Sequence, residues 1–342
     1  MRRTGEMRRA GLTIGTRQDV DDGEIIALAT RADELGYDTV WAGEAWGRDV
    51  FTVLTMIACH TRNLRVGTGI ATVFSRTPTL IAQSIASLDI ISQGRAVLGL
   101  GTSGRRVVEG WHGVSYQRPL ERTAEYIRII RLALSGQRVD FEGRLFRLAR
   151  FRLPFTPLRP TIPIFVASLG PRNLALTGEL ADGWLPTWVH VDHLPAMRDK
   201  VRQGAEGAGR TIDQVSTAPY ILCHVAASSE EMDRGRRLLG GHMAYYIGGM
   251  GDYYHRLFSR YGYREECDGI RGAWRSGDRT LAASLVSEDM LDKVAVLGGV
   301  DECRAKLDAY RAAGADVPVV GFPHGCSPDE ALRTLEALAP GG

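Results

Sequence analysis

The segment from Val97 to Gly104 combines an apolar strand with the spacing Gly-x-Gly-x-x-Gly. A glycine-rich turn after a strand presents backbone amides that can bind a phosphate group. Glu109 and His112 follow in an acidic, aromatic segment, and both side chains are of types that transfer protons in enzymes. These residue types in this order predict a cofactor site with candidate proton-transfer groups beside it.

The same spacing is the fingerprint of dinucleotide-binding folds, but its position argues against that class. In those folds the glycines follow the first strand, and a helix begins directly after them. Here at least three strand-like segments precede the motif. No helix is expected directly after Gly104, and the next one opens at Pro119. The sequence therefore predicts a phosphate-binding turn in another type of α/β protein.

Short apolar segments alternate with helical segments along most of the chain. Strands are expected at 12–16, 39–42, 64–69, 96–100, 164–167, near Trp184, at 220–226 and at 317–321, and helices at 22–35, 52–61, 79–91, 121–134, 173–180, 194–208, 301–313 and 329–338. Repeated β-α units with short turns imply a parallel sheet with right-handed crossovers. About eight such units favour an α/β fold of the (β/α)8 TIM-barrel type.

Two insertions and a tail interrupt this alternation. We expect a disordered tail at 1–10 and a single barrel domain at 11–340. An insertion near 138–160 contains alternating residues around Gly143, typical of a β-hairpin. A second, irregular insertion near 240–285 is rich in tyrosine, which suits a substrate lid or an oligomer contact.

Composition excludes several functions. The 342 residues carry a formal net charge of +2 and no long basic run, which argues against nucleic acid as a partner. No apolar run is long enough for a membrane span or a signal peptide, so we expect a cytoplasmic protein. The five cysteines are scattered, and His190, His193 and His242 lack metal-ligand spacing, so we expect no metal site.

Several motifs in order resemble the luciferase-like monooxygenase superfamily. The run Glu34–Trp41 followed by Glu44 carries the resemblance, as do Gly67–Ile70 and Arg76–Pro78. Within that superfamily, the segments Gly101–Gly113 and 163–171 are similar to the branch that uses the deazaflavin coenzyme F420, as in methylenetetrahydromethanopterin reductase. The resemblance implies F420 in preference to FMN, a small-molecule substrate and a homodimer.

The resemblance also implies roles for particular residues. Glu44 would lie close to the ring of the cofactor, although an exposed loop carboxylate is the alternative for this residue. A non-prolyl cis peptide between Gly69 and Ile70 would form a bulge behind the ring. The full set of implied cofactor-binding residues is Glu44, Gly69, Ile70, Gly101, Thr102, Ser103, Gly104, Ala167, Ser168, Leu169 and Gly170. The backbone amides of the turns at 102–104 and 168–170 would bind the phosphate, and these are called the two turns below. Arg105, Arg106 and Arg172 lie beside them and would suit a polyglutamate tail, with solvated surface positions as the alternative.

One departure from the family pattern bears on the reaction. Many members have a histidine after the acid, whereas this chain has Ala45. Without that imidazole base, oxidation of an alcohol is disfavoured, and reduction of a C=C or C=N bond by an F420H2-dependent reductase is expected. Candidate proton donors are Glu44, Asp49, Glu109 and His112, of which Glu44, Glu109 and His112 are the expected catalytic residues.

The substrate wall and two other functions stay open at this stage. Trp46, Trp111, Trp184 and Trp188 are expected to overhang the barrel mouth as an apolar wall, with ordinary core packing as the alternative. An FMN-dependent monooxygenase on the same barrel is the alternative enzyme. A non-catalytic member of the family is the third possibility.

Overall fold

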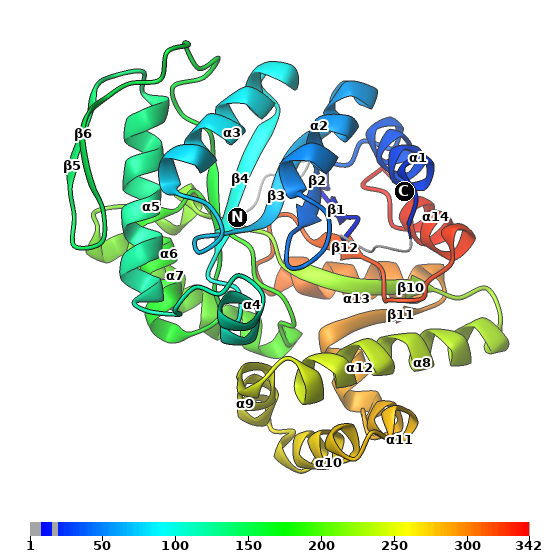
Figure 1. The fold of residues 1–342 in the computed structure, drawn as a ribbon. Coiled ribbons are helices and arrows are strands. Elements are labelled where there is room, and N and C mark those ends of the chain that lie inside the picture. Colours follow the sequence, from blue (N-terminus) through cyan, green and yellow to red (C-terminus); the bar gives the residue numbers. More distant parts are fainter. Residues whose placement is uncertain (1–7, 16–19, 342) are drawn as a thin grey trace.

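A parallel sheet of ten strands forms the centre of the molecule (Figure 1). The structure is a computed structural model that describes residues 8–15 and 20–341. The strands are β1 (Gly11–Thr13), β2 (Thr39–Gly43), β3 (Arg65–Thr72), β4 (Ala96–Gly101), β7 (Ile164–Ala167), β8 (Gly183–Trp184), β9 (Ser216–Thr217), β10 (Tyr220–Val225), β11 (Ala295–Gly298) and β12 (Val319–Gly321). Every pairing in this sheet is parallel, as expected when helices connect successive strands.

The sheet closes on itself. β12 pairs with β1 on one side and with β10 on the other. β9 pairs with β8 and runs into β10 after only Ala218 and Pro219, and Thr187 bridges to Tyr220. Because proline has no N–H to donate, Pro219 divides one strand into β9 and β10. The closed ring has eight strand positions, so the predicted (β/α)8 barrel is confirmed.

Helices connect the strands, and most of them cover the outside of the barrel (Figure 1). They are α1 (Asp22–Glu34), α2 (Val50–His60), α3 (Pro78–Ile91), α4 (Arg105–Gly110), α5 (Pro119–Leu134), α6 (Pro171–Leu180), α7 (Leu194–Gly207), α8 (Ser229–Ala244), α9 (Asp252–Tyr261), α10 (Arg264–Arg275), α11 (Arg279–Ser284), α12 (Glu288–Val294), α13 (Val300–Ala312) and α14 (Pro328–Ala337). Side chains fix several starts: Asp21 caps α1, Asp49 caps α2, and Thr77 with Pro78 opens α3. Each side-chain oxygen accepts a backbone N–H that the first turn leaves without a helical partner.

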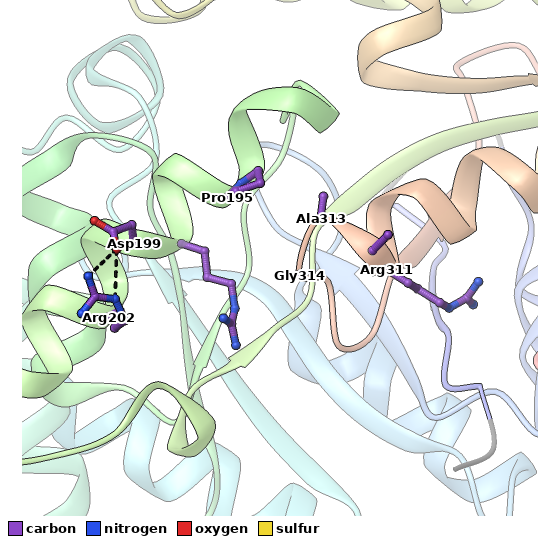
Figure 2. Close-up of a pocket in the computed structure, with 8 residues that line it drawn as sticks. Pro195, Asp199, Arg202, Arg311, Ala313 and Gly314 are labelled. Atoms are coloured by element: carbon purple, nitrogen blue, oxygen red, sulfur yellow. Dashed lines mark hydrogen bonds and ion pairs between the residues drawn. The ribbon is translucent and has the colours of Figure 1, made fainter. Parts of the chain in front are cut away.

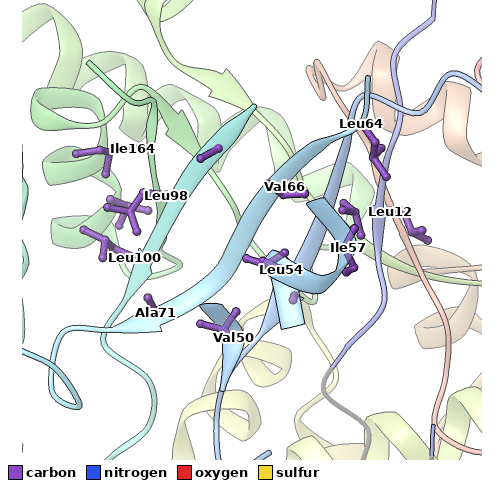
Figure 3. Close-up of a cluster of buried hydrophobic side chains, with 14 of the residues drawn as sticks. Leu12, Val50, Leu54, Ile57, Leu64, Val66, Ala71, Leu98, Leu100 and Ile164 are labelled. Carbon is purple, nitrogen blue, oxygen red and sulfur yellow. The ribbon is translucent and has the colours of Figure 1, made fainter. Parts of the chain in front are cut away.

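The main core lies between the strands and this helical layer. Leu54 and Ile57 of α2 pack against Leu12 of β1, Val66 of β3 and Leu64 just before β3, and all five are fully buried (Figure 3). Apolar residues three and four positions apart place one face of each helix against the sheet. Burying a leucine or isoleucine side chain contributes about 1.5–3 kcal/mol, so this layer fixes the barrel that carries the loops.

Large aromatic side chains fill part of the barrel interior. The rings of Trp41 and Phe165 meet edge to face, with centroids 5.2 Å apart. A Cβ at Gly67 would lie 2.5 Å from the Trp41 ring, and a Cβ at Gly183 would lie 2.1 Å from the Phe165 ring. Glycine at both positions is therefore required for the two rings to enter the barrel.

The two insertions differ from each other. The first is an antiparallel hairpin of β5 (Val139–Glu142) and β6 (Arg147–Phe151), which confirms the hairpin around Gly143. The second is helical and begins with α8, so the expectation of an irregular segment is wrong. In Figure 1, α9, α10 and α11 lie beyond α8, outside the ring of barrel helices.

Glycines on the buried face explain why α8 was missed. Gly235 and Gly240 share that face with Leu239 and Met243, and a Cβ at Gly235 would lie 2.6 Å from the ring of His224. In α10 the buried residues Cys267, Ile270 and Ala273 are three positions apart, which is a helical spacing within a tyrosine-rich region.

A further correction concerns the helix after the glycine motif. The short helix α4 does begin directly after Gly104, contrary to expectation. Ser103 has a left-handed backbone (φ 53°), and the Gly104 carbonyl accepts the amides of Val107 and Val108. Without a side-chain cap and with only six residues, this helix left no start signal in the sequence.

The structure describes only part of the tail expected at residues 1–10. Residues 1–7 of the expected tail lie outside the described residues. Residues 8–10 are not a tail: Arg9 bonds to Asp38, and Ala10 is fully buried. Within the described ranges, no helix combines the length and apolar character needed to cross a bilayer.

Candidate active site

A cavity of about 790 Å³ opens at the carboxyl ends of the barrel strands. Residues that follow β1, β2, β4, β8 and β12 line it, together with Gly69 and Ile70 of β3 and the end of β7. In barrels of this type, loops at the carboxyl ends of the strands carry the functional residues. The two glycine turns, predicted independently, meet at this one cavity.

The structure brings most of the expected site residues together and separates three of them. Ten line the cavity: Glu44, Gly69, Ile70, Thr102, Ser103, Gly104, Ala167, Ser168, Leu169 and Gly170. Gly101, Glu109 and His112 do not line it. All but one of the expected cofactor-binding residues therefore line one cavity, whereas two of the three expected catalytic residues lie elsewhere.

A bulge in β3 forms part of the cavity wall. Ala42 of β2 pairs with Thr68, but the next residue, Gly43, pairs with Ile70, so Gly69 is the extra residue. The Thr68 hydroxyl donates to the Gly99 carbonyl at 2.8 Å and accepts the Gly99 amide at 2.7 Å. The side chain of Thr68 thus satisfies backbone groups of β4 where the regular register is lost.

The cis peptide bond expected at this bulge is not found. Among the described residues no peptide bond is cis, so the Gly69–Ile70 bond is trans. A bulge already accommodates one extra residue through local backbone bending. A non-prolyl cis bond would cost a further 3 kcal/mol or so, and the register shift does not require it.

The three glycines of the motif have different functions. A Cβ at Gly99 would lie 2.0 Å from the Thr68 carbonyl oxygen, and a Cβ at Gly101 would lie 2.6 Å from Ile70 Cγ2. Both positions therefore accommodate the bulge. A Cβ at Gly104 would meet no atom within 4 Å, so this glycine faces open space in the cavity.

Backbone amides without acceptors gather at the two turns. Within the described chain, the amides of Ser103, Gly104, Leu169 and Gly170 donate no backbone hydrogen bond outside the regular elements. Asn173, in the first turn of α6, also lines the cavity, and its Oδ1 atom is buried with no hydrogen-bond partner. These groups offer several donors and one acceptor to a ligand, which fits a phosphate followed by hydroxyl groups.

Glu44 is held by an arginine. Arg76 donates to both carboxylate oxygens of Glu44 at 2.6 and 2.7 Å and also bonds to Asp49. The Glu44 side chain is 9% exposed. These hydrogen bonds raise the pKa of Arg76. Burial alone would raise the pKa of Asp49, but hydrogen bonds from Thr52 and the Arg76 charge outweigh it and lower that pKa. Asp49, as the cap of α2, and Glu44 are therefore anchored carboxylates.

Glu109 and His112 have local contacts. Glu109 accepts from Arg105 at 2.6 Å and from the Tyr116 amide at 3.1 Å, so it orders the segment between α4 and α5. Arg106, expected at the rim, donates to the Gly249 carbonyl. The Nε2 atom of His112 is buried with no hydrogen-bond partner, away from the cavity lining.

The four tryptophans divide between cavity and core. Trp46 and Trp188 line the cavity. Trp184 is fully buried, and its Nε1 donates to the Ser168 carbonyl at 2.8 Å, which supports the second turn from below. Trp111 is 63% exposed and does not line the cavity. Two of the four tryptophans expected to form an apolar wall therefore line the cavity, and two do not.

Sequence reasoning missed two parts of the site. Arg76 was noticed only as part of a family motif, because pairing over 32 residues leaves no local signal. Asn173 looked like an ordinary helix residue. The tyrosine-rich insertion was expected to form a lid or an oligomer contact, and the structure places its residues His242 and Tyr246 in the cavity lining. In the part of the chain that the structure describes, no three His, Cys, Asp or Glu side chains form a group suited to a metal ion.

A second hollow of about 460 Å³ lies between α7 and the turn before β12 (Figure 2). Pro195, Asp199 and Arg202 line one side, and Ala313 and Gly314 line the other. This turn precedes the amino end of β12, whereas the residues of the larger cavity follow the strands. Residues at the amino ends of barrel strands generally serve stability, so the larger cavity is the candidate active site.

Comparisons with known proteins agree with this geometry. A putative coenzyme F420-dependent oxidoreductase from Mycobacterium tuberculosis is 34% identical over 330 residues, covering 91% of this chain and 93% of that protein. A 5,10-methylenetetrahydromethanopterin reductase from Methanolobus tindarius is 29% identical, covering 91% and 94%. The solved F420-dependent tetrahydromethanopterin reductase of Methanopyrus kandleri superposes with a TM-score of 0.86 at 25% identity, covering 98% of both chains. The family model for luciferase-like monooxygenases matches residues 8–317. The chain therefore belongs to the luciferase-like monooxygenase family.

Proposed function

We propose that this protein is a coenzyme F420-dependent oxidoreductase that acts as a reductase on a C=C or C=N bond of a small organic substrate. The observation that carries the proposal is the pair of turns with unpaired amides, Ser103–Gly104 and Leu169–Gly170, beside the β3 bulge in one cavity. The names of the relatives support F420 as the cofactor. FMN is the alternative cofactor.

The residues present fit the deazaflavin. An anionic phosphate suits the amides of the two turns, because several N–H donors converge without acceptors of their own. The buried Oδ1 of Asn173 suits a neighbouring hydroxyl group. A Cβ at Gly43 or Gly104 would meet no atom within 4 Å, so both glycines leave room for the ligand. When bound, a reduced deazaflavin supplies hydride chemistry.

The protein's own residues would bind the cofactor and orient its ring. The bulge at Gly69–Ile70 provides a wall against which a planar ring can lie. Glu44, fixed by Arg76, borders the cavity directly after β2. Both oxygens already accept hydrogen bonds from the guanidinium. Glu44 would therefore orient and polarise the bound ring and would not donate a proton.

The direction of the reaction follows from the group after Glu44. Ala45 lines the cavity where an imidazole would otherwise stand. Oxidation of an alcohol requires a base for the hydroxyl proton. With Glu44 engaged by Arg76 and no imidazole at position 45, reduction is the favoured direction.

Titration tests the cofactor. Oxidised F420 and FMN are added separately to the purified protein, and tryptophan fluorescence is followed, because Trp46 and Trp188 line the cavity. We expect micromolar binding of F420 and none of FMN. Binding of FMN alone would instead favour an oxygenase, for which oxygen consumption is the next assay.

We also propose a homodimer. Helix α3 exposes Leu80, Ile90 and Ile91, which are 46%, 44% and 46% accessible. Apolar side chains exposed on one helix suit a subunit contact. Sedimentation equilibrium tests this proposal: a monomer at micromolar concentration would contradict it.

A reducing compartment, and hence the cytoplasm, is the proposed location. Cys59, Cys223, Cys267 and Cys303 are thiols outside any disulfide, and the last three are buried. Thiols outside disulfides are typical of proteins kept in reducing compartments. Fractionation of cells that express the protein tests this location.

A further inference from the structure

An aromatic wall borders the cavity next to the turn at 168–170, where a Cβ at Gly170 would lie 3.9 Å from the Tyr253 hydroxyl. We define it by Trp188, His242, Tyr245, Tyr246, Tyr253 and Tyr254, all of which line the cavity. The rings of His242 and Tyr246 stack with centroids 5.4 Å apart and planes 27° apart. Tyr246 meets Tyr254 edge to face at 4.8 Å and meets Trp188 at 5.1 Å. The contacts between these rings fix them as one surface.

The wall is built by the helical insertion. Tyr245 and Tyr246 begin a π-helical turn, Tyr245–Gly249, at the end of α8, and Tyr253 and Tyr254 belong to α9. Such turns are rare and frequently occur at functional sites. Arg106 of α4 donates to the carbonyl of Gly249 and so ties this turn to the segment after β4. The wall is thereby held against the barrel that carries the cofactor turns.

The described lining of the cavity carries no lysine or arginine. The basic side chains among those lining residues are His242 and His324. The formal charges of that lining are those of Glu24 and Glu44, and Arg76 offsets Glu44 from outside the lining. The unpaired amides of the two turns suit an anion, but the cofactor phosphate would occupy them. A second anion would meet repulsion from the carboxylates and no lysine or arginine among the described lining residues.

The tyrosines of the wall are uncharged at neutral pH. Burial raises the pKa of Tyr246 to about 12, and burial also raises the pKa of Tyr254 well above its ordinary value. The pKa values of Tyr245 and Tyr253 are raised as well, again chiefly by burial. Their hydroxyl groups therefore keep their protons and offer neutral hydrogen bonds.

We propose that the substrate is a flat, uncharged, conjugated ring compound that packs on the aromatic wall and is not phosphorylated or carboxylated near the reacting bond. Aromatic side chains favour planar ligands through offset-stacked and edge-to-face contacts, worth about 0.5–1.5 kcal/mol per pair beyond area burial. The proposal rests on the proposed function, because the cofactor is taken to occupy the two turns.

A matched pair of probes tests the proposal. Coumarin is flat, uncharged and has a C=C bond conjugated to a carbonyl, and coumarin-3-carboxylate adds one negative charge. Calorimetric titrations are run with the protein alone and with the protein saturated with oxidised F420. We expect coumarin to bind at least tenfold more tightly than the carboxylate in the saturated protein. Equal affinities, or tighter binding of the carboxylate, would overturn the proposal.

Variants separate the wall from the rest of the cavity. Tyr246→Ala removes a central ring and is expected to weaken coumarin binding at least fivefold, with thermal melting to verify the fold. Tyr245→Lys adds a cation at the wall and is expected to reduce the preference for coumarin at least threefold by strengthening carboxylate binding. Phe151→Lys, on the distant hairpin, is the matched control and should leave the preference as it is. An unchanged preference in Tyr245→Lys would count against the charge argument.

The two proposals fail in different ways. If F420 does not bind, the proposed function fails, and the probe titrations with the protein alone still report on the wall. If F420 binds but coumarin shows no preference over its carboxylate, the substrate proposal fails and the function stands.

Discussion

The guanidinium of Arg76 donates to both carboxylate oxygens of Glu44, with N–O distances of 2.6 and 2.7 Å. The side chains are 17% and 9% exposed, so this ion pair is largely removed from water. It joins the residue after β2 to the segment between β3 and α3 at the cavity mouth. Sequence reasoning had singled out Glu44 alone, whereas the structure pairs it with Arg76.

Removal of Arg76 should therefore cost both stability and binding. In Arg76→Ala the carboxylate of Glu44 remains buried without its partner, which typically costs about 3 kcal/mol or more. We expect a clear fall in melting temperature and at least a tenfold loss of F420 affinity. Arg48→Ala is the control, because Arg48 pairs with Asp22 at the surface and surface pairs contribute about 0–1 kcal/mol. Equal effects of the two variants would contradict the assignment.

The glycines of the motif should respond differently to alanine. Gly101→Ala places a Cβ 2.6 Å from Ile70 Cγ2, so the bulge must move. Overpacking of this kind costs about 1–3 kcal/mol, and denaturant unfolding should show it. Gly104→Ala meets no atom within 4 Å and should keep its stability, but it should lose cofactor affinity because the methyl group enters the phosphate site. A destabilised Gly104→Ala with normal affinity would be inconsistent with this division.

Glu109 should prove to be a loop-ordering residue. It accepts from Arg105 and from the Tyr116 amide and does not line the cavity. We expect Glu109→Gln to keep more than half of kcat and the same pH profile once a substrate is in hand. A fall in kcat of a hundredfold with an altered pH profile would instead restore the expectation of a catalytic acid.

A buried histidine should make the protein sensitive to mild acid. His224 on β10 is fully buried, and neither ring nitrogen has a hydrogen-bond partner. Burial lowers its pKa, with the nearby charges of Glu330 and Arg333 acting in opposite directions. Since the folded pKa lies below the unfolded value of about 6.5, the unfolded state takes up the proton first. Stability is therefore unaffected above that pH and falls below it, by at most about 1.4 kcal/mol per pH unit.

His224→Leu tests this origin of acid sensitivity. Melting temperatures are compared between pH 7.5 and pH 5 for both proteins. The variant should lose less stability on acidification than the wild type. His190, whose pKa burial also lowers, remains in both proteins and accounts for a residual effect. An equal fall in melting temperature for the two proteins would show that His224 is not the origin of the acid sensitivity.

The order of elements and the cofactor turns could be predicted because they leave local signals. Strands and helices alternate with recognisable apolar spacing, and the turn at Thr102–Gly104 follows its strand directly. Because all parallel strands of a closed barrel end at the same edge, residues after neighbouring strands must meet there. The turns after β4 and β7 could thus be assigned to one cavity before any distance was known.

Contacts between distant segments were decided only by the tertiary structure. The pairing of Arg76 with Glu44, the use of Gly99 and Gly101 to accommodate a bulge and the position of Tyr246 over the barrel all depend on packing between separate elements. Glu109 lay near the glycines in sequence, but helix α4 directed it to Arg105 and away from the cavity. The sequence by itself determined which residues follow the strands, since that is a matter of chain order. Which side chains point into the cavity depends on helix direction and strand register, and these are fixed only when the whole core packs.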